Sequence, residues 1–196
     1  MEKSMKIIFQ AVVFFIVIST ISGIFYPLVI TALGQLLWHH KSNGSLIKEG
    51  NMVIGSELIA QKFSNEKYFF PRFSASDFNA LPGSASNLGP TSARHSLLIQ
   101  ERRKSQSKFY HVPEKNIPSD LLTTSASGLD PHISIQSAKL QLERVAENRA
   151  LSEQEKNKVA DLIKKLSQGF WIKNDRTKIV NVLLLNLSVD KCCRHD

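Results

Sequence analysis

The chain has 196 residues, of which 25 are Lys or Arg and 17 are Asp or Glu, and its formal net charge is +8. It contains no GxxxxGK[ST] loop, no GxSxG elbow, no HExxH pair and no CxxC pairs, which excludes the nucleotide-binding proteins, serine hydrolases and zinc enzymes that carry these motifs. The part that follows residue 38 is long enough for one domain of ordinary size.

A run without formal charge extends from Ile7 to Trp38. Its apolar centre, Ile7 to Ile30, spans about 36 Å as a helix, more than the roughly 30 Å of a hydrocarbon core. A cleaved signal peptide normally ends its apolar stretch after about 7 to 15 residues, whereas the best cleavage candidate here, Thr20 to Ser22, lies inside the run. We therefore expect residues 1–38 to be an N-terminal segment with one uncleaved transmembrane helix.

The charges beside this run predict its orientation. Lys3 and Lys6 precede it, and positively charged flanks favour the cytoplasmic side, although His40, Lys41 and Lys48 weaken the contrast. We expect a cytoplasmic N-terminus and an extracytoplasmic domain. A basic domain in that place favours anionic lipid headgroups or an acidic protein surface as partners over nucleic acid, and a solvated basic face is the alternative.

Small residues recur within the apolar run. Phe15, Ser19, Gly23 and Pro27 stand at every fourth position, which places them on one helix face. Because small residues let another helix approach closely, Ser19, Gly23 and Pro27 are candidates for membrane helix packing. The alternative is that Ser and Gly are merely frequent in membrane helices and that Pro27 only kinks this one.

Helical and loop patterns alternate in the first half of the domain. After a linker from Lys41 to Gly50, the apolar spacing of Gly55 to Phe63 predicts a helix. The stretch from Ser74 to Ser92 is dense in Ser, Asn, Gly and Pro, which indicates a long loop. A basic helix is expected over Ala93 to Lys108, followed by a second loop from Thr123 to Pro131.

Three further elements are predicted in the second half. Apolar residues at helical spacing predict a helix from Ser134 to Arg149. Ser152 and Glu155 form a capping box at the start of the next helix, with Gly169 at the position of a C-cap glycine. The near-continuous apolar run from Val180 to Val189 favours a buried strand.

These patterns predict an α+β fold: a single N-terminal transmembrane helix followed by one mixed α+β domain over residues 39–190, with long Gly-, Ser- and Pro-rich loops. Residues 191–196 are expected to be a polar tail. Cys192 and Cys193 are adjacent there, too close in sequence for an ordinary disulfide, and we expect them to join nothing inside the fold. Pairing between chains in an oxidising compartment is the alternative.

Several strings of residues follow one another in a specific order. The two most specific are Ser-Asn-Leu-Gly-Pro-Thr at 86–91 and Ser-Gly-Leu-Asp-Pro-His-Ile at 127–133. Shorter ones extend from Tyr26-Pro27 to Asn186: Gly55-Ser56, Leu58-Ile59, Gln61, Phe63, Tyr68-Phe69, Arg72, Ser74-Ala75, Arg144-Val145-Ala146, Arg149 and Val180-Asn181-Val182. Taken together, they resemble the C subunit of the bacterial Kdp-type potassium-transporting ATPase. The chain departs from that family at Phe73, where proline is usual, and at Ser84-Ala85, where a glycine pair is usual.

The resemblance implies a non-catalytic, single-span accessory subunit of a four-part potassium pump in the bacterial inner membrane. Its partners would supply the potassium path and a P-type ATPase, which hydrolyses ATP. The resemblance further implies that this subunit stabilises the complex and acts as a catalytic chaperone that raises the ATP affinity of the ATPase subunit. No cofactor is expected to bind stably, and ATP enters only through the catalytic subunit.

The glycine-bearing loops hold the remaining candidate residues. We expect Ser125, Ser127, Gly128, Asp130 and His132 either to contact a partner or ligand or to shape a turn in which the serines bond to backbone. As a hydrolase triad, Ser127, Asp130 and His132 would have to provide a nucleophile, a base and an orienting group from within one loop.

Two other groups have alternative interpretations. Asn87 and Gly89 are expected either to form a backbone nest for an anion or to adopt a left-handed turn. His39 and His40 have no evident third ligand and are expected at the membrane interface rather than on a metal ion. Three function classes remain open: a pump subunit, a membrane-tethered extracytoplasmic module that binds a small solute, and a tethered hydrolase that uses Ser127.

Overall fold

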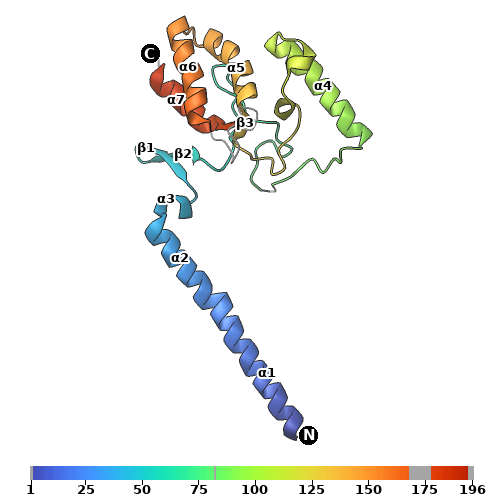
Figure 1. Ribbon diagram of the computed structural model, residues 1–196, viewed down its shortest axis with the longest axis vertical. Helices are drawn as coiled ribbons and strands as arrows, with labels where there is room; N and C mark the ends of the chain where they lie inside the picture. Colours follow the sequence, from blue (N-terminus) through green and yellow to red (C-terminus); the bar gives the residue numbers. More distant parts are fainter. Residues whose placement is uncertain (1, 82, 168–177, 194–196) are drawn as a thin grey trace. The chain divides into compact units, whose positions relative to one another are not determined.

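The computed structural model describes residues 2–81, 83–167 and 178–193, and the chain divides into two compact units between Leu46 and Ile47. The first unit contains a long helical stretch, Glu2–Leu37 (Figure 1). Among the described helices, this 36-residue stretch is long and apolar enough to cross a membrane, judged by length and composition. Its elements are α1 (Glu2–Thr20), the π-helical turn η1 (Ile21–Phe25) and α2 (Tyr26–Leu37), and the short α3 (His39–Ser42) follows.

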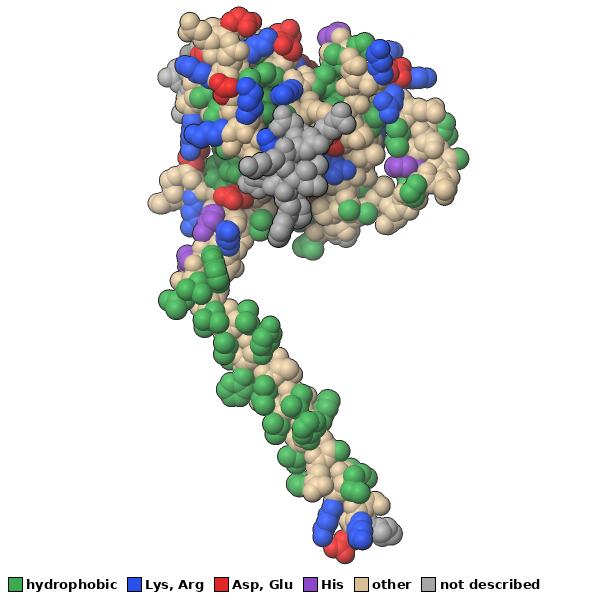
Figure 2. All heavy atoms as spheres, in the orientation of Figure 1, with side chains coloured by type: hydrophobic (Ala, Val, Ile, Leu, Met, Phe, Trp, Pro, Cys, Tyr) green, Lys and Arg blue, Asp and Glu red, His purple; other side chains and the backbone are tan. Residues whose placement is uncertain are grey.

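Apolar side chains cover this stretch along its length, and charged side chains gather at its N-terminal end (Figure 2). None of the described residues in α1, η1 and α2 is buried. Contact with water is unfavourable for so large an apolar surface, and a lipid bilayer removes that contact. The helix therefore has the form expected of a membrane anchor.

The second unit mixes helices with short strands, which confirms the α+β prediction. In the described residues the strands form two small sheets: β1 pairs with β2, and β3 pairs antiparallel with β4, with Ile133 opposite Val180. β1 begins at the boundary between the units. The elements are β1 (Leu46–Glu49), β2 (Met52–Ser56), α4 (Ala93–Tyr110), η2 (Glu114–Asn116), η3 (Ser119–Leu121), β3 (His132–Ser134), α5 (Ile135–Asn148), α6 (Glu153–Leu166), β4 (Ile179–Asn181) and α7 (Val182–Cys192).

The main core lies among α5, α6 and α7, which pack side by side (Figure 1). Val145 on α5, Val159 on α6 and Leu185 on α7 are fully buried. Their helices bury apolar residues three or four positions apart, which is the spacing of one helix face. Phe69 is also fully buried in this core, although it belongs to a segment outside any helix or strand.

Three predicted helices are confirmed. The helix expected over Ala93 to Lys108 is α4, and the one expected from Ser134 to Arg149 is α5. α6 begins with the predicted capping box, in which the Ser152 hydroxyl accepts from the Glu155 N–H and the Glu155 carboxylate accepts from the Ser152 N–H at 2.9 Å. The C-cap predicted at Gly169 lies outside the described residues.

The strand predicted from Val180 to Val189 is wrong. Strand β4 ends at Asn181, and α7 begins at the next residue. Asn181 caps this helix, because its Oδ1 accepts from the Leu184 N–H at 3.1 Å. A continuous apolar run fits a buried helix as well as a buried strand, so the asparagine is the residue that separates the two interpretations.

The helix predicted from Gly55 to Phe63 is also wrong. β2 ends at Ser56, whose Oγ accepts from the Leu58 N–H in a local turn. A Cβ at Gly55 would lie 2.5 Å from Nε2 of Gln61 and 2.8 Å from Cδ2 of Leu183. The glycine therefore serves a close approach between segments rather than a helix.

The expected polar tail, residues 191–196, begins inside a helix. α7 includes Lys191 and Cys192, and Cys193 is 4% exposed within the main core. A disulfide joins the adjacent Cys192 and Cys193, which the sequence did not lead us to expect, but it cross-links no separate segments of the fold. Residues 194–196 lie outside the described part of the chain.

Candidate functional site

The first candidate surface is the face of Ser19, Gly23 and Pro27 on the long helix. Gly23 lies within the π-helical turn η1, and Pro27 lies in the first turn of α2. Proline has no N–H to donate, so it interrupts the helix hydrogen bonds one turn earlier, where the π-helical turn occurs. A Cβ at Gly23 would have nothing within 4 Å. The surface is open at this point, and its use in helix packing stays a prediction.

In the second unit, the loop from Ser125 to His132 docks on the segment that follows Arg72. The Ser125 N–H donates to the Phe73 carbonyl at 3.2 Å, and Phe73 pairs with Thr124 in an isolated β-bridge. The Arg102 guanidinium lies 4.3 Å from the centroid of the Phe73 ring. Phe73 therefore contributes a ring contact that the proline usual in the resembled family does not provide.

Gly128 marks a close contact between this loop and residues 74–84. Its φ is +72°, which L side chains rarely adopt. A Cβ there would lie 2.9 Å from Ser76 Oγ, 2.9 Å from the Ser84 carbonyl oxygen and 3.2 Å from Ser74 Oγ. Both the backbone conformation and the available space require glycine. The two predicted polar loops are therefore in contact here.

Asp130 is the charged centre of the loop. One carboxylate oxygen accepts from the His132 N–H at 3.0 Å and lies 3.2 Å from His132 Nδ1, and the other oxygen lies 3.4 Å from Arg72 Nη1. Burial by itself would raise the pKa of the Asp130 carboxyl. The hydrogen bonds from His132 and the nearby positive charges outweigh burial and lower this pKa below its ordinary value. The geometry thus holds Asp130 as a carboxylate.

Ser127 is exposed and shapes a turn, as one of its two interpretations expects. Its hydroxyl accepts from the Leu129 N–H at 3.1 Å. His132 contacts Asp130, but in the residues that the structure describes it makes no hydrogen bond with Ser127. The nucleophile and base of a triad are therefore not paired in this loop. Ser125 is buried beside it.

Asn87 and Gly89 lie on an exposed stretch before α4. Asn87 has a φ of +53°, in the left-handed region that the turn interpretation expects. The Gly89 carbonyl accepts from the Ser92 N–H at 3.1 Å, and a Cβ at Gly89 would have nothing within 4 Å. Across residues 2–81, 83–167 and 178–193, neither residue forms a hydrogen bond with the Ser125 to His132 loop.

The histidines near the membrane helix, His39 and His40, belong to α3. Nδ1 of His39 lies 3.3 Å from Nδ2 of Asn43. Within the described ranges, no group of three or more His, Cys, Asp or Glu side chains is placed to hold a metal ion.

Sequence reasoning misses a clamp on residues 66–70, a segment of turn and irregular backbone that bonds to side chains of α5 and α7 and to Arg149. The Asn186 side-chain amide accepts from the Phe69 N–H at 2.8 Å and donates to the Phe69 carbonyl at 3.0 Å. Gln141 does the same for Phe70, at 2.7 and 3.0 Å. Each amide thus satisfies a backbone N–H and a backbone carbonyl in a segment that belongs to no helix or strand.

Two arginines complete the clamp. Arg144 donates to the carbonyl of Glu66 and, at 2.9 Å, to that of Tyr68. Arg149 donates through Nε to the Lys67 carbonyl at 2.7 Å. The strings that carry the family resemblance include both arginines and Tyr68, so the resemblance is the one sequence signal that points to these residues. Their observed role is to hold the fold together.

Comparisons with known proteins agree with this resemblance. The family model described as "KdpC: K+-transporting ATPase, c chain" matches residues 8–191. A protein named "Potassium-transporting ATPase KdpC subunit" from Paraburkholderia xenovorans (strain LB400) is 39% identical over 124 residues, which cover 61% of this chain and 65% of the relative.

Two further relatives carry the same printed name. The one from Mycobacterium tuberculosis (strain H37Rv) is 40% identical over 114 residues, covering 57% of this chain and 58% of the relative. The one from Rhodospirillum rubrum is 38% identical over 115 residues, which cover 58% of this chain and 60% of the relative. The matched segments thus span between 58% and 65% of the length of these three relatives.

Proposed function

Because the chain belongs to the KdpC family, described as the c chain of the K+-transporting ATPase, we propose that it is a non-catalytic accessory subunit of an ATP-driven potassium import pump. The observation that carries this proposal is the family match over residues 8–191, which takes in both the apolar helix and most of the folded domain. In this proposal, ATP hydrolysis and the potassium path belong to other subunits.

The long helix anchors the subunit in the bacterial inner membrane. Its N-terminus lies in the cytoplasm and its domain on the outer side, an orientation favoured by Lys3 and Lys6. Membrane lipid surrounds most of the helix. The open surface at Gly23 supports contact between the Ser19 and Gly23 face and a helix of the potassium-path or ATPase subunit.

The domain stabilises the complex by bracing it from outside the membrane. Its polar loops are held in place before any partner arrives, because Gly128 packs on the serines of residues 74–84 and Asp130 is bonded to Arg72 and His132. A surface that is already ordered loses little conformational entropy when it binds. This rigidity supports a bracing role for the exposed residues beside it.

The subunit also acts as a catalytic chaperone that raises the ATP affinity of the ATPase subunit, as the family resemblance implies. With the domain outside the membrane, ATP contacts no residue of it, and no cofactor binds stably. The effect on ATP affinity is then a coupling between two sites, which passes through the contacts between the subunits.

Affinity purification from membranes tests the proposal. We expect a tagged form of the chain, expressed with its chromosomal neighbours and extracted in mild detergent, to recover a P-type ATPase and a multi-span potassium-path protein in constant ratio. A tagged, unrelated single-span protein of the same membrane is the control. Recovery of the chain without either protein, under conditions in which both are present in the extract, would contradict the proposal.

A further inference from the structure

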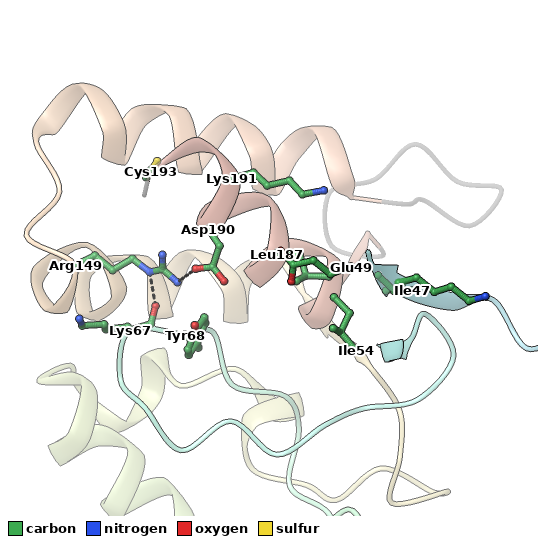
Figure 3. Close-up of a pocket in the computed structure, with 11 residues that line it drawn as sticks. Ile47, Glu49, Ile54, Lys67, Tyr68, Arg149, Leu187, Asp190, Lys191 and Cys193 are labelled. Carbon is green, nitrogen blue, oxygen red and sulfur yellow. Dashed lines mark hydrogen bonds and ion pairs between the residues drawn. The ribbon is translucent and has the colours of Figure 1, made fainter. Parts of the chain in front are cut away.

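A cavity of about 560 Å³ lies within the second unit, beside the β1–β2 hairpin, Lys67, Tyr68 and the end of α7 (Figure 3). Its volume is in the range of cavities that bind small molecules. None of the candidate residues from the polar loops lines it, so the pump proposal leaves it without a role.

The lining carries an excess of two positive charges. It contains the basic side chains of Lys48, Lys67, Arg149 and Lys191 and the acidic side chains of Glu49 and Asp190. Asp190 is already paired with Arg149, at 2.6 Å. Among the described residues, no ion pair involves any of the three lysines, so their charges remain available to an anion.

Arg149 is built into the wall of the cavity, and its side chain is only 9% exposed. Nε donates to the Lys67 carbonyl at 2.7 Å, Nη2 bonds to Asp190, and the guanidinium carbon lies 5.0 Å from the centroid of the Tyr68 ring. Nη1 has no partner among the described residues, and Figure 3 shows it turned away from both Lys67 and Asp190. A guanidinium fixed in this way is an ordered donor for an oxyanion.

Apolar residues line the other end of the cavity. Figure 3 shows Ile54 and Leu187 there, beside the strand that carries Ile47 and away from Arg149, with the Glu49 side chain next to Leu187. A ligand that matches both ends has an anionic group joined to a short apolar part. Phosphate offers several oxygens to separate donors and carries one or two negative charges, which suits the two uncompensated charges of the lining.

We propose that this cavity binds a phosphate-bearing anion, which is either the headgroup of an anionic phospholipid or a free phosphate monoester. A chain anchored by a membrane helix is always close to phospholipid headgroups, so their effective concentration is high. The binding does not depend on assembly of the pump, and its failure would leave the proposed function intact.

Two probes distinguish the sources. The full chain in neutral detergent is titrated calorimetrically with glycerol 3-phosphate. In parallel, the full chain in phosphatidylcholine nanodiscs is unfolded by heat with and without phosphatidylglycerol. Binding of glycerol 3-phosphate would identify the ligand as a free phosphate monoester. Stabilisation by phosphatidylglycerol alone would identify it as a lipid headgroup. Either result supports the proposed site.

Charge variants locate the binding. We expect the double variant Lys48→Gln with Lys191→Gln to weaken binding by about tenfold or more, since both lysines line the cavity. The matched control, Lys158→Gln with Lys165→Gln, removes the same charge from exposed positions on α6 and should change binding by less than about twofold. An equal loss in both variants, or no response of the unmodified chain to either probe at about 10 mM, would overturn the proposal.

Discussion

Gly128 is the residue at which a single added carbon has the most predictable effect. We expect Gly128→Ala to lower the free energy of unfolding by about 1–3 kcal/mol, because the new Cβ would strain a backbone at φ +72° and meet Ser76 and Ser84 at 2.9 Å. Urea unfolding of the full chain in detergent measures this. Gly89→Ala is the matched control and should stay within about 0.5 kcal/mol, since a Cβ there meets nothing. Equal unfolding midpoints for the two variants would refute the close contact.

Asp130 makes the stability of the domain depend on pH. Its folded-state pKa is lowered, so the carboxylate stabilises the fold above the unfolded-state pKa of about 3.9, and this contribution is lost as pH falls through the folded-state pKa. We expect the urea midpoints of the unmodified chain and of Asp130→Asn to differ most near about pH 6 and to converge in acid, once the pH has fallen below the folded-state pKa of Asp130.

A matched carboxylate provides the control for this pH dependence. Asp161 lies on α6 with its side chain 76% exposed, and among the described residues it pairs only with Lys164, at 3.1 Å. Asp161→Asn should differ little from the unmodified chain at either pH, because exposed ion pairs contribute little to stability. If Asp130→Asn behaves in the same way, the bonds from His132 and Arg72 do not stabilise the loop.

At the level of elements, the sequence predicts those whose signals are local. The capping box of Ser152 and Glu155 lies within four residues, and α6 follows it as expected. The run from Val180 to Val189 fits two kinds of buried element, and a single asparagine cap decides between them. The clamp cannot be predicted in this way, because the amide of Asn186 and the backbone that it bonds are far apart in sequence. The sequence likewise predicts that the Gly128 loop is polar. It does not predict the contact of this loop with Ser74, Ser76 and Ser84, because those residues are also far from Gly128 in sequence.

The next prediction concerns the Ser19 and Gly23 face of the long helix as a packing surface. We expect Gly23→Leu to weaken association with the proposed partner subunits roughly fivefold or more, because the larger side chain keeps a partner helix at a distance. Within this chain a side chain at Gly23 meets nothing, so the helix itself should form normally. The amount of each partner recovered by affinity purification is the measurement.

Ala32→Leu is the control for that substitution. Ala32 lies nine residues beyond Gly23, about half a turn away around the helix, and is also exposed. The Ala32→Leu substitution also introduces a leucine side chain, but on the opposite face of the helix, so assembly with the partner subunits should be unaffected. Normal recovery of the partners with Gly23→Leu would rule out the Ser19 and Gly23 face as the packing surface.

For the whole molecule, the side of the membrane on which the domain lies decides between two mechanisms by which the subunit could raise ATP affinity: direct contact with ATP, or coupling through the contacts between subunits. We expect alkaline phosphatase fused after Asp196 to be active and a fluorescent protein fused at the same place to stay dark, since the first works only outside the cytoplasm and the second is bright only inside. Fusions at the N-terminus should give the reverse. A bright C-terminal fusion would place the domain beside ATP and favour direct contact with it.

The clamp on residues 66–70 also sets the order in which the molecule takes shape. Phe69 bonds to Asn186, 117 positions further along the chain. Until the ribosome has made α7, the Phe69 N–H and carbonyl lack these bonds, and burying them unpaired is costly. We therefore expect the core to close late, because its closure needs contacts between residues that are far apart in sequence. A chain truncated before α7 should therefore be digested readily by proteases. Protease resistance of the domain would then appear only after α7 has been synthesised.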